Sequence, residues 1–150
     1  METTCVLIKP DAVTAHRIGQ IIARFEEAGL TITDCKMLAL TSDVLAQHYV
    51  HLLEKPFYGE LETFMQSSPV VALAVTGDNA VARVRALAGP TNPEKAEPGT
   101  IRKDFGTDVM LNAIHASDAL SAAEEELQRF GLSSDFGTGE ESRSIAAAMA

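Results

Sequence analysis

The chain has no tryptophan and only two cysteines, Cys5 and Cys35, among its 150 residues. Both cysteines lie in apolar stretches, and no second pair has the spacing of metal ligands, so we expect two buried free thiols in a reducing compartment. No segment approaches the ~18 consecutive apolar residues that a membrane span needs, and the N-terminus has no basic region followed by a long apolar run. We therefore expect a cytoplasmic protein with no membrane partner.

Basic residues are also scarce. The chain carries 12 Lys and Arg against 21 Asp and Glu, which gives a formal net charge of −9. Because a protein this acidic repels nucleic acid overall, we expect no specific nucleic-acid partner. Any phosphate site must be a local basic patch. Hydrophobic residues make up 46 % of the chain, which is enough for one domain of this length to bury a core.

The sequence lacks the two commonest phosphate-binding motifs. It has no Gly-x-x-x-x-Gly-Lys-Ser/Thr loop, and Gly137-Thr138-Gly139 is not surrounded by the strand and helix that a dinucleotide fingerprint requires. If nucleotides bind to this chain, they must therefore bind by another device.

Apolar stretches of strand length alternate with stretches of helical periodicity along the chain. The apolar run at 70–75 indicates a buried central strand, and the alternation of the preceding strand breaks near Asp34, as at a β-bulge. Apart from an extra helical hairpin, the order is βαββαβ, which predicts an α+β fold with an antiparallel sheet and helices on one face. The expected strands are residues 3–8, 30–40, 70–75 and 109–115.

A loop rich in Pro and Gly at residues 89–100 has the composition of a functional loop. It is a poor domain linker, because neither flanking part is large enough to fold alone. We assign residues 1–131 to one domain. The remaining tail, 132–150, is small and polar and then rich in alanine, and we expect it to be loosely ordered.

His115 is the most unusual candidate for chemistry, because it closes an apolar strand and is followed at once by polar residues that favour turns. On position alone, a lone histidine at a strand end is more often structural. Glu126 shares a helix face with apolar residues, and a carboxylate there needs a partner such as an imidazole N–H. That pairing would leave the other ring nitrogen free to attack. Glu126 could equally be solvated at the edge of an acidic run.

Three cations could form the local basic patch: Lys9, Arg85 and Arg102. Taken singly, each is most simply a surface charge, but together they would supply the charge stabilisation that phosphoryl transfer requires. Among the few aromatic residues, Tyr49 is expected in the core. Phe57 is either a surface on which a base stacks or a hydrophobic plug for the helical hairpin.

Taken together, these residues resemble the nucleoside diphosphate kinase family. The resemblance runs in order and without an evident gap from about residue 3 to residue 130. The joint occurrence of these motifs is specific for the family, although any one motif alone would not be. The matching segments are Ile8-Lys9-Pro10-Asp11, Gln47-His48-Tyr49, Lys55-Pro56-Phe57-Tyr58, Gly89-Pro90-Thr91-Asn92-Pro93, Gly99-Thr100-Ile101-Arg102 and Asn112 through Asp118.

The resemblance implies a ferredoxin-like fold and a reaction in which the terminal phosphate of a nucleoside triphosphate moves to a nucleoside diphosphate. It implies that His115 is the phosphorylated nucleophile, attacking through Nδ1, that Glu126 orients it, and that Lys9 assists catalysis. It further implies a nucleotide site with Mg²⁺ on the phosphates, to which Asp118 is bound through water. The implied nucleotide-binding residues are Lys9, Tyr49, Phe57, Leu61, Arg85, Thr91, Arg102, Val109 and Asn112.

The chain departs from the family pattern at three places. Ala116 replaces the usual glycine after the active histidine, and Ala119 replaces a serine that often follows the aspartate. The alanine-rich tail replaces an aromatic, acidic C-terminus that often seals subunit contacts. The resemblance therefore implies a homo-oligomer but leaves open whether it is a dimer, a tetramer or a hexamer.

Two other functions are compatible with the same scaffold. A non-catalytic regulatory protein could bind nucleotides there, and a relay protein could pass phosphate from His115 to a protein carboxylate. The presence of His115, Lys9 and Arg102 argues against the first, and a relay would not need Phe57.

The apolar character of Phe57, Leu61 and Val109 predicts a broad tolerance for the base. Stacking on a ring is worth about 1–3 kcal/mol per base in single-strand binders and is similar for all bases. ADP, GDP, CDP and UDP should all be phosphorylated, with kcat/KM values that spread over roughly two decades or less. In steady-state assays, Phe57→Ala should lower kcat/KM for all four nucleoside diphosphates, and most for the two purines. A spread of about four decades would instead indicate a polar group that reads the base.

Overall fold

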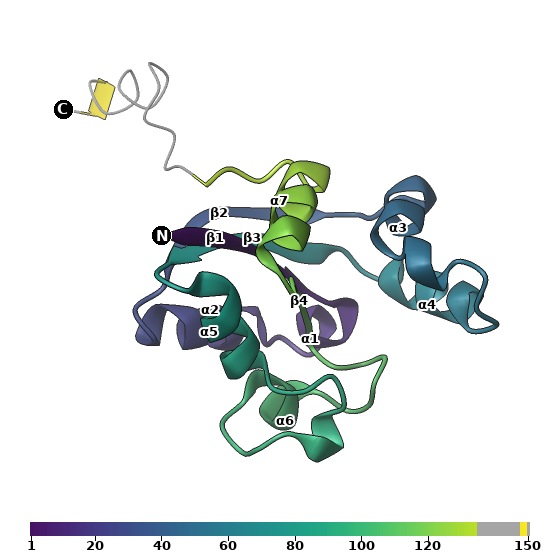
Figure 1. Cartoon of the computed structure of the whole chain (residues 1–150). Coiled ribbons are helices and arrows are strands. Elements are labelled where there is room, and N and C mark those ends of the chain that lie inside the picture. Colours follow the sequence, from purple (N-terminus) through teal and green to yellow (C-terminus); the bar gives the residue numbers. More distant parts are fainter. Residues whose placement is uncertain (135–147, 150) are drawn as a thin grey trace.

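The structure is a computed structural model that describes residues 1–134 and 148–149. Its centre is a four-stranded antiparallel sheet in the order β2-β3-β1-β4, in which every neighbouring pair runs antiparallel (Figure 1). This order confirms the predicted ferredoxin-like α+β fold. The strands are β1 (Glu2–Ile8), β2 (Thr31–Leu38), β3 (Val70–Gly77) and β4 (Ile114–Ala116).

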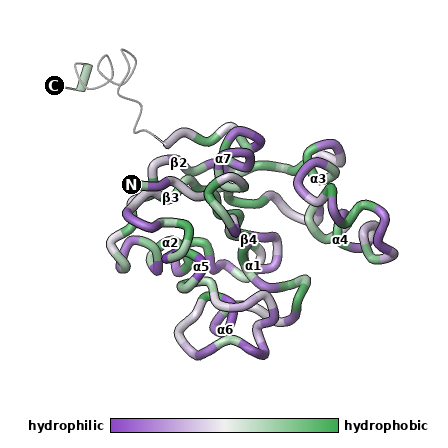
Figure 2. The backbone as a smooth tube through the Cα atoms, viewed as in Figure 1, coloured by the Kyte–Doolittle hydropathy of each residue, from purple (hydrophilic) through white to green (hydrophobic). Residues whose placement is uncertain are grey.

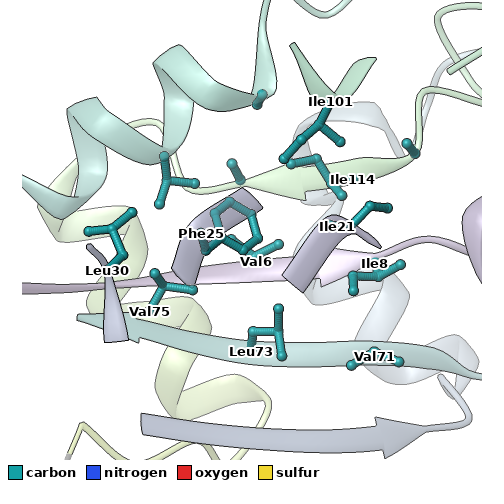
Figure 3. Packing of buried hydrophobic residues seen from close by; sticks show 14 of the residues in the cluster. Val6, Ile8, Ile21, Phe25, Leu30, Val71, Leu73, Val75, Ile101 and Ile114 are labelled. Atoms are coloured by element: carbon teal, nitrogen blue, oxygen red, sulfur yellow. The ribbon is translucent and has the colours of Figure 1, made fainter. Parts of the chain in front are cut away.

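One face of the sheet packs on the two helices expected from the βαββαβ pattern, α2 (Ile18–Glu27) and α5 (Ala80–Ala88). Because successive side chains of a strand alternate between faces, Val6 and Ile8 of β1 point to this side. They join Phe25 of α2, which is completely buried (Figure 3). A short helix, α1 (Pro10–Thr14), directly follows β1.

Helices also cover the opposite face, beyond the single helical layer that the sequence predicted. Cys5 and Leu7 of β1 form a second buried cluster there. The covering helices carry hydrophilic and hydrophobic stretches in turn, as in α7 (Figure 2), so they can bury one side and expose the other. They are α7 (Leu120–Arg129) and the expected extra hairpin, built from α3 (Ser42–His48), the 3₁₀ turn η1 (Val50–Leu52) and α4 (Tyr58–Met65).

The last strand is much shorter than the predicted 109–115. Only Ile114–Ala116 pairs with β1. Before it, Asp108 accepts hydrogen bonds from the backbone N–H groups of Met110 and Leu111, and Ala113 has a φ of 74°. A side chain that binds neighbouring backbone N–H groups competes with strand pairing, so the apolar residues before Ile114 form a turn.

The edge strand β2 confirms one expectation and corrects another. Its register with β3 shifts between Ile32 and Asp34, which is the predicted bulge. Cys35 is exposed and not buried, whereas Cys5 is buried in the centre of the sheet. A strand at the edge of a sheet has fewer neighbours to cover it, which explains the difference.

The Pro- and Gly-rich loop folds back against the end of the sheet near β4. It contains the 3₁₀ turn η2 (Pro93–Lys95) and leads into α6 (Ile101–Phe105). Gly89 begins the loop at a φ of 83°, and a Cβ atom there would lie 2.9 Å from Thr100. Both the conformation and the close approach therefore require glycine at this position.

Within residues 1–134 and 148–149, no helix is long and apolar enough to cross a membrane. Residues 135–147 of the tail, for which we expect loose order, lie outside the described part of the chain. The boundary at residue 131 therefore remains a prediction.

The sheet depends on the packing of Phe25, which fills the space between α2 and the strands. Phe25→Ala should lower the free energy of unfolding by about 3–5 kcal/mol, the usual cost of truncating a buried aromatic residue. Chemical denaturation monitored by circular dichroism measures this change. Leu120→Ala, at a side chain that is 45 % exposed, is the matched control and should change stability by less than about 0.5 kcal/mol. Equal losses in both variants would contradict the packing account.

Candidate active site

A cavity of about 830 Å³ opens between the α3–α4 hairpin, β4, α7 and the loop that follows α5. Every residue that the sequence proposed for a site lines this one cavity, although these residues come from widely separated parts of the chain. They are Lys9, Tyr49, Phe57, Leu61, Arg85, Thr91, Arg102, Val109, Asn112, His115, Asp118 and Glu126.

His115 and Glu126 form the pair that the sequence suggested. The Nε2 atom of His115 lies 2.7 Å from Oε1 of Glu126, and Ser117 donates its hydroxyl to the same oxygen at 2.7 Å. Burial alone would raise the pKa of Glu126, but the hydrogen bonds from His115 and Ser117, together with nearby imidazole charge, lower it overall. An ionised Glu126 can only accept a hydrogen bond, so Nε2 carries the ring proton and donates it in that bond. No described residue hydrogen-bonds Nδ1, which is therefore free to react.

The backbone around His115 is held from both sides. His115 pairs with Leu7 of β1, between two buried neighbours, Ile114 and Ala116. At the start of this strand, a carboxylate oxygen of Asp11 accepts a hydrogen bond from the N–H of Ala113 at 3.0 Å. This contact supports the left-handed conformation of Ala113, which a residue with a side chain rarely adopts. The sequence motif containing Asp11 thus positions the strand that carries His115.

Lys9 lies at the C-terminal end of β1 and is buried. Its ammonium group donates to the carbonyl of Met110 at 2.7 Å and to Oδ1 of Asn112 at 2.8 Å. The amide of Asn112 in turn donates to the carbonyl of Thr91 at 3.0 Å. Burial lowers the pKa of Lys9 to about 8, an effect that Asp11 partly opposes.

The two arginines hold their guanidinium groups against backbone carbonyls. Arg102 is buried and donates to the carbonyls of Gly89 and Ile114, while Arg85 donates to the carbonyl of Ala116. Burial, and to a smaller extent the charge of Arg85, lowers the pKa of Arg102 to about 10. Arg102 is thus fixed beside the strand that carries His115, whereas Arg85 is an exposed residue with one hydrogen bond of 3.2 Å to that strand.

The other end of the cavity is apolar. Phe57 is 43 % exposed, which agrees better with a stacking surface than with a plug buried in the helical hairpin. Val109 is also exposed, whereas Leu61 belongs mainly to the core beneath α4. Tyr49 is largely buried, as expected, yet it lines the cavity, and burial raises the pKa of its hydroxyl, which keeps it protonated.

Sequence reasoning missed three residues that the fold brings to this site. Ser117 completes the hydrogen bonds to Glu126, and its place two residues after His115 was the available signal. The ring of His48 packs edge-to-face on the ring of His115, with centroids 4.5 Å apart, and Arg129 contacts His48 at 3.0 Å. No local pattern links α3 to the end of α7, so only the tertiary structure could reveal the last pair.

The family departures have visible local effects. Ala119 stands at the N-cap of α7 and offers no side-chain hydrogen bond to the first turn, whereas a serine cap there is typically worth about 0.5–2 kcal/mol. Ala116 is buried, and its carbonyl accepts the hydrogen bond from Arg85. The contact between His115 and Glu126 is present with both alanines in place.

The fold and the cavity define a class of protein. It is an α+β domain that presents a histidine with one free ring nitrogen to a pocket containing fixed cations, an arrangement suited to transferring an anionic group. A sequence model of the family described as nucleoside diphosphate kinase matches residues 2–135. The chain therefore belongs to the nucleoside diphosphate kinase family.

Individual relatives agree with this assignment. The chain is 44 % identical over 135 residues to a nucleoside diphosphate kinase of Halalkalibacterium halodurans, covering 90 % of this chain and 92 % of that one. It is 48 % identical over 130 residues to one of Rhodospirillum centenum, covering 87 % and 93 %. A crystal form of the Aquifex aeolicus nucleoside diphosphate kinase superposes with a TM-score of 0.82 at 41 % identity, covering 86 % of this chain and 94 % of that one.

The lowered pKa of Lys9 predicts opposite effects of pH on nucleotide binding and on stability. Lys9 is charged below about pH 8 and neutral above it, so its attraction for a phosphate is complete below that pH and is lost as pH rises through it. In the unfolded chain Lys9 keeps its proton until about pH 10.4. The contribution of this residue to the free energy of unfolding should therefore increase between those two values.

Two measurements check this prediction. A plot of log kcat/KM against pH should bend downward near pH 8, and this limb should be absent from the residual activity of Lys9→Gln. Stability titrations of both proteins isolate the contribution of Lys9 as their difference. If the alkaline limb is unchanged in Lys9→Gln, the titration that causes it belongs to another group.

Proposed function

We propose that this chain transfers the terminal phosphate of a nucleoside triphosphate to a nucleoside diphosphate through a phosphohistidine on His115. The observation that carries this proposal is the hydrogen bond between His115 Nε2 and Glu126. It directs the N–H of the ring at Glu126 and leaves the lone pair of Nδ1 for attack. Family membership supports the reaction class, and the residue roles are our assignment.

In the first half-reaction, the Nδ1 lone pair of His115 attacks the terminal phosphorus. A nitrogen–phosphorus bond forms, the bond to the bridging oxygen breaks, and the nucleoside diphosphate leaves with that oxygen. Glu126 balances the positive charge that develops on the ring. In the second half-reaction, a terminal oxygen of another nucleoside diphosphate attacks the phosphohistidine, which returns the electron pair to Nδ1.

The cations hold the phosphates during both half-reactions. Lys9 is fixed by neighbouring oxygens and keeps a donor for the transferred phosphoryl group, while Arg85 and Arg102 bind the rest of the chain of phosphates. Asn112 and Thr91, which are hydrogen-bonded to each other, contact sugar and phosphate. Because these groups are already positioned by backbone carbonyls, they need little reorganisation as charge shifts in the transition state.

The residues present also fit Mg²⁺ bound mainly by the nucleotide. Magnesium prefers oxygen ligands and usually keeps several waters and substrate phosphates, with one or two carboxylates from the protein. Asp118 is an exposed carboxylate that lines the cavity near His115, and it would hold the hydrated ion. The ion would neutralise negative charge on the phosphates.

The regulatory and relay alternatives explain less of the cavity. Neither requires a hydrogen-bonded nucleophile, fixed cations and an exposed aromatic surface in one pocket. We also expect a homo-oligomer in the cytoplasm. The edge strand β2, with Met37 59 % exposed, offers one surface for association, and light scattering would establish the number of subunits.

The decisive experiment is phosphorylation of the protein by radiolabelled ATP followed by unlabelled GDP. The label should appear on His115 as an acid-labile, base-stable phosphate and then move to GTP. His115→Gln should take up no label, while Glu126→Gln, which leaves His115 in place, should be labelled more slowly. Initial rates should give the parallel double-reciprocal lines of a ping-pong mechanism. Full labelling of His115→Gln would refute the proposal.

A further inference from the structure

His48, at the end of α3, is a buried histidine that the proposed mechanism does not use. Its side chain is enclosed by the rings of Tyr49, Phe130 and His115. Although only 8 % of the residue is exposed, it lines the cavity. Its Nε2 atom is buried without a hydrogen-bond partner among the described residues. Such a group is unfavourable unless a water or a ligand supplies the missing partner.

The partner of the other ring nitrogen decides the tautomer. Arg129 approaches Nδ1 of His48 at 3.0 Å, and a guanidinium group can only donate. Nδ1 must therefore accept, and the proton of the neutral ring is on Nε2. Burial and the charge of His115 lower the pKa of His48 to about 3; Arg129 and His51 act in the same direction, and Glu126 opposes them. His48 is thus a neutral donor.

A metal ion is a poorer occupant of this position. Ring nitrogens of His48 and His115 and a carboxylate oxygen of Glu126 lie within 4.8 Å of one another, so the spacing alone is compatible with a divalent cation. A metal on Nε2 would force the proton of His48 to Nδ1, against the donor of Arg129. The guanidinium charge would also repel the cation.

We propose that His48 is a further catalytic residue, whose Nε2–H donates a hydrogen bond to the phosphoryl group as it moves onto Nδ1 of His115. This inference rests on the proposed function. No described residue offers an acceptor to this N–H, and a phosphoryl group brings oxygens that can accept from it. Because His48 contacts the ring of His115 edge-to-face, the donor is fixed relative to the nucleophile.

The test compares two variants at the same position. His48→Phe keeps an aromatic ring but has no donor, whereas His48→Gln keeps an N–H donor and loses the ring. Rapid-quench measurements of ³²P transfer from ATP to the protein should show a loss of about tenfold or more for His48→Phe, with partial recovery in His48→Gln. If His48 acted only by packing, the order would be reversed.

Controls separate this inference from the proposed function and from misfolding. His16→Asn changes an exposed histidine outside the cavity, at a φ of 62° that asparagine tolerates, and should leave labelling unchanged. Absence of label in the unmodified protein would refute the proposed function itself. Should His48→Phe fail to fold, Arg129→Met offers a second test. This variant keeps His48 but removes the donor that fixes its tautomer, and it should slow labelling.

Nitrogen-15 spectra of the unmodified protein give an independent readout. They should show His48 as the neutral Nε2–H tautomer, and Arg129→Met should introduce the other tautomer. Labelling of His48→Phe at the normal rate, or a proton on Nδ1 of His48 in the unmodified protein, would overturn the inference.

Discussion

The hydrogen bond between His115 and Glu126 is the interaction on which the proposed function depends. It joins β4 to α7 across one face of the sheet at 2.7 Å, and Ser117 holds the same carboxylate oxygen. A buried carboxylate is costly unless its oxygens are satisfied, so Glu126 needs these donors as much as His115 needs its acceptor. The same contact thus satisfies the buried carboxylate and orients the proposed nucleophile.

In this acidic chain, the proposed phosphate site consists of a few cations that the fold gathers in one place. Its net charge of −9 opposes anions at long range, but Lys9 and Arg102 are buried and held by the protein's own oxygens. Burial lowers the pKa of each, which is the physical sign that their charges lack full hydration. A bound phosphate would supply the missing counter-charge, so the cost of burying these cations would favour binding of the proposed substrate.

The limits of prediction follow from the range of the interactions involved. The β2 bulge and the central position of residues 70–75 depend on local patterns and were predicted correctly. The strand expected at 109–115 was wrong for its first five residues, because Asp108 binds the adjacent backbone and replaces strand pairing. Cys35 was expected to be buried, but its exposure depends on the place of β2 at the edge of the sheet.

The sequence by itself determined the residue types, the alternation of elements and the family resemblance, because side-chain periodicity and motif spacing are local properties. It therefore named the residues that line the cavity. Only the tertiary structure showed that Nε2 of His115 contacts Glu126, that Ser117 shares the same carboxylate, and that His48 and Arg129 meet beside His115. These contacts join α3, β4 and α7, and packing around the sheet brings together elements that no sequence pattern connects.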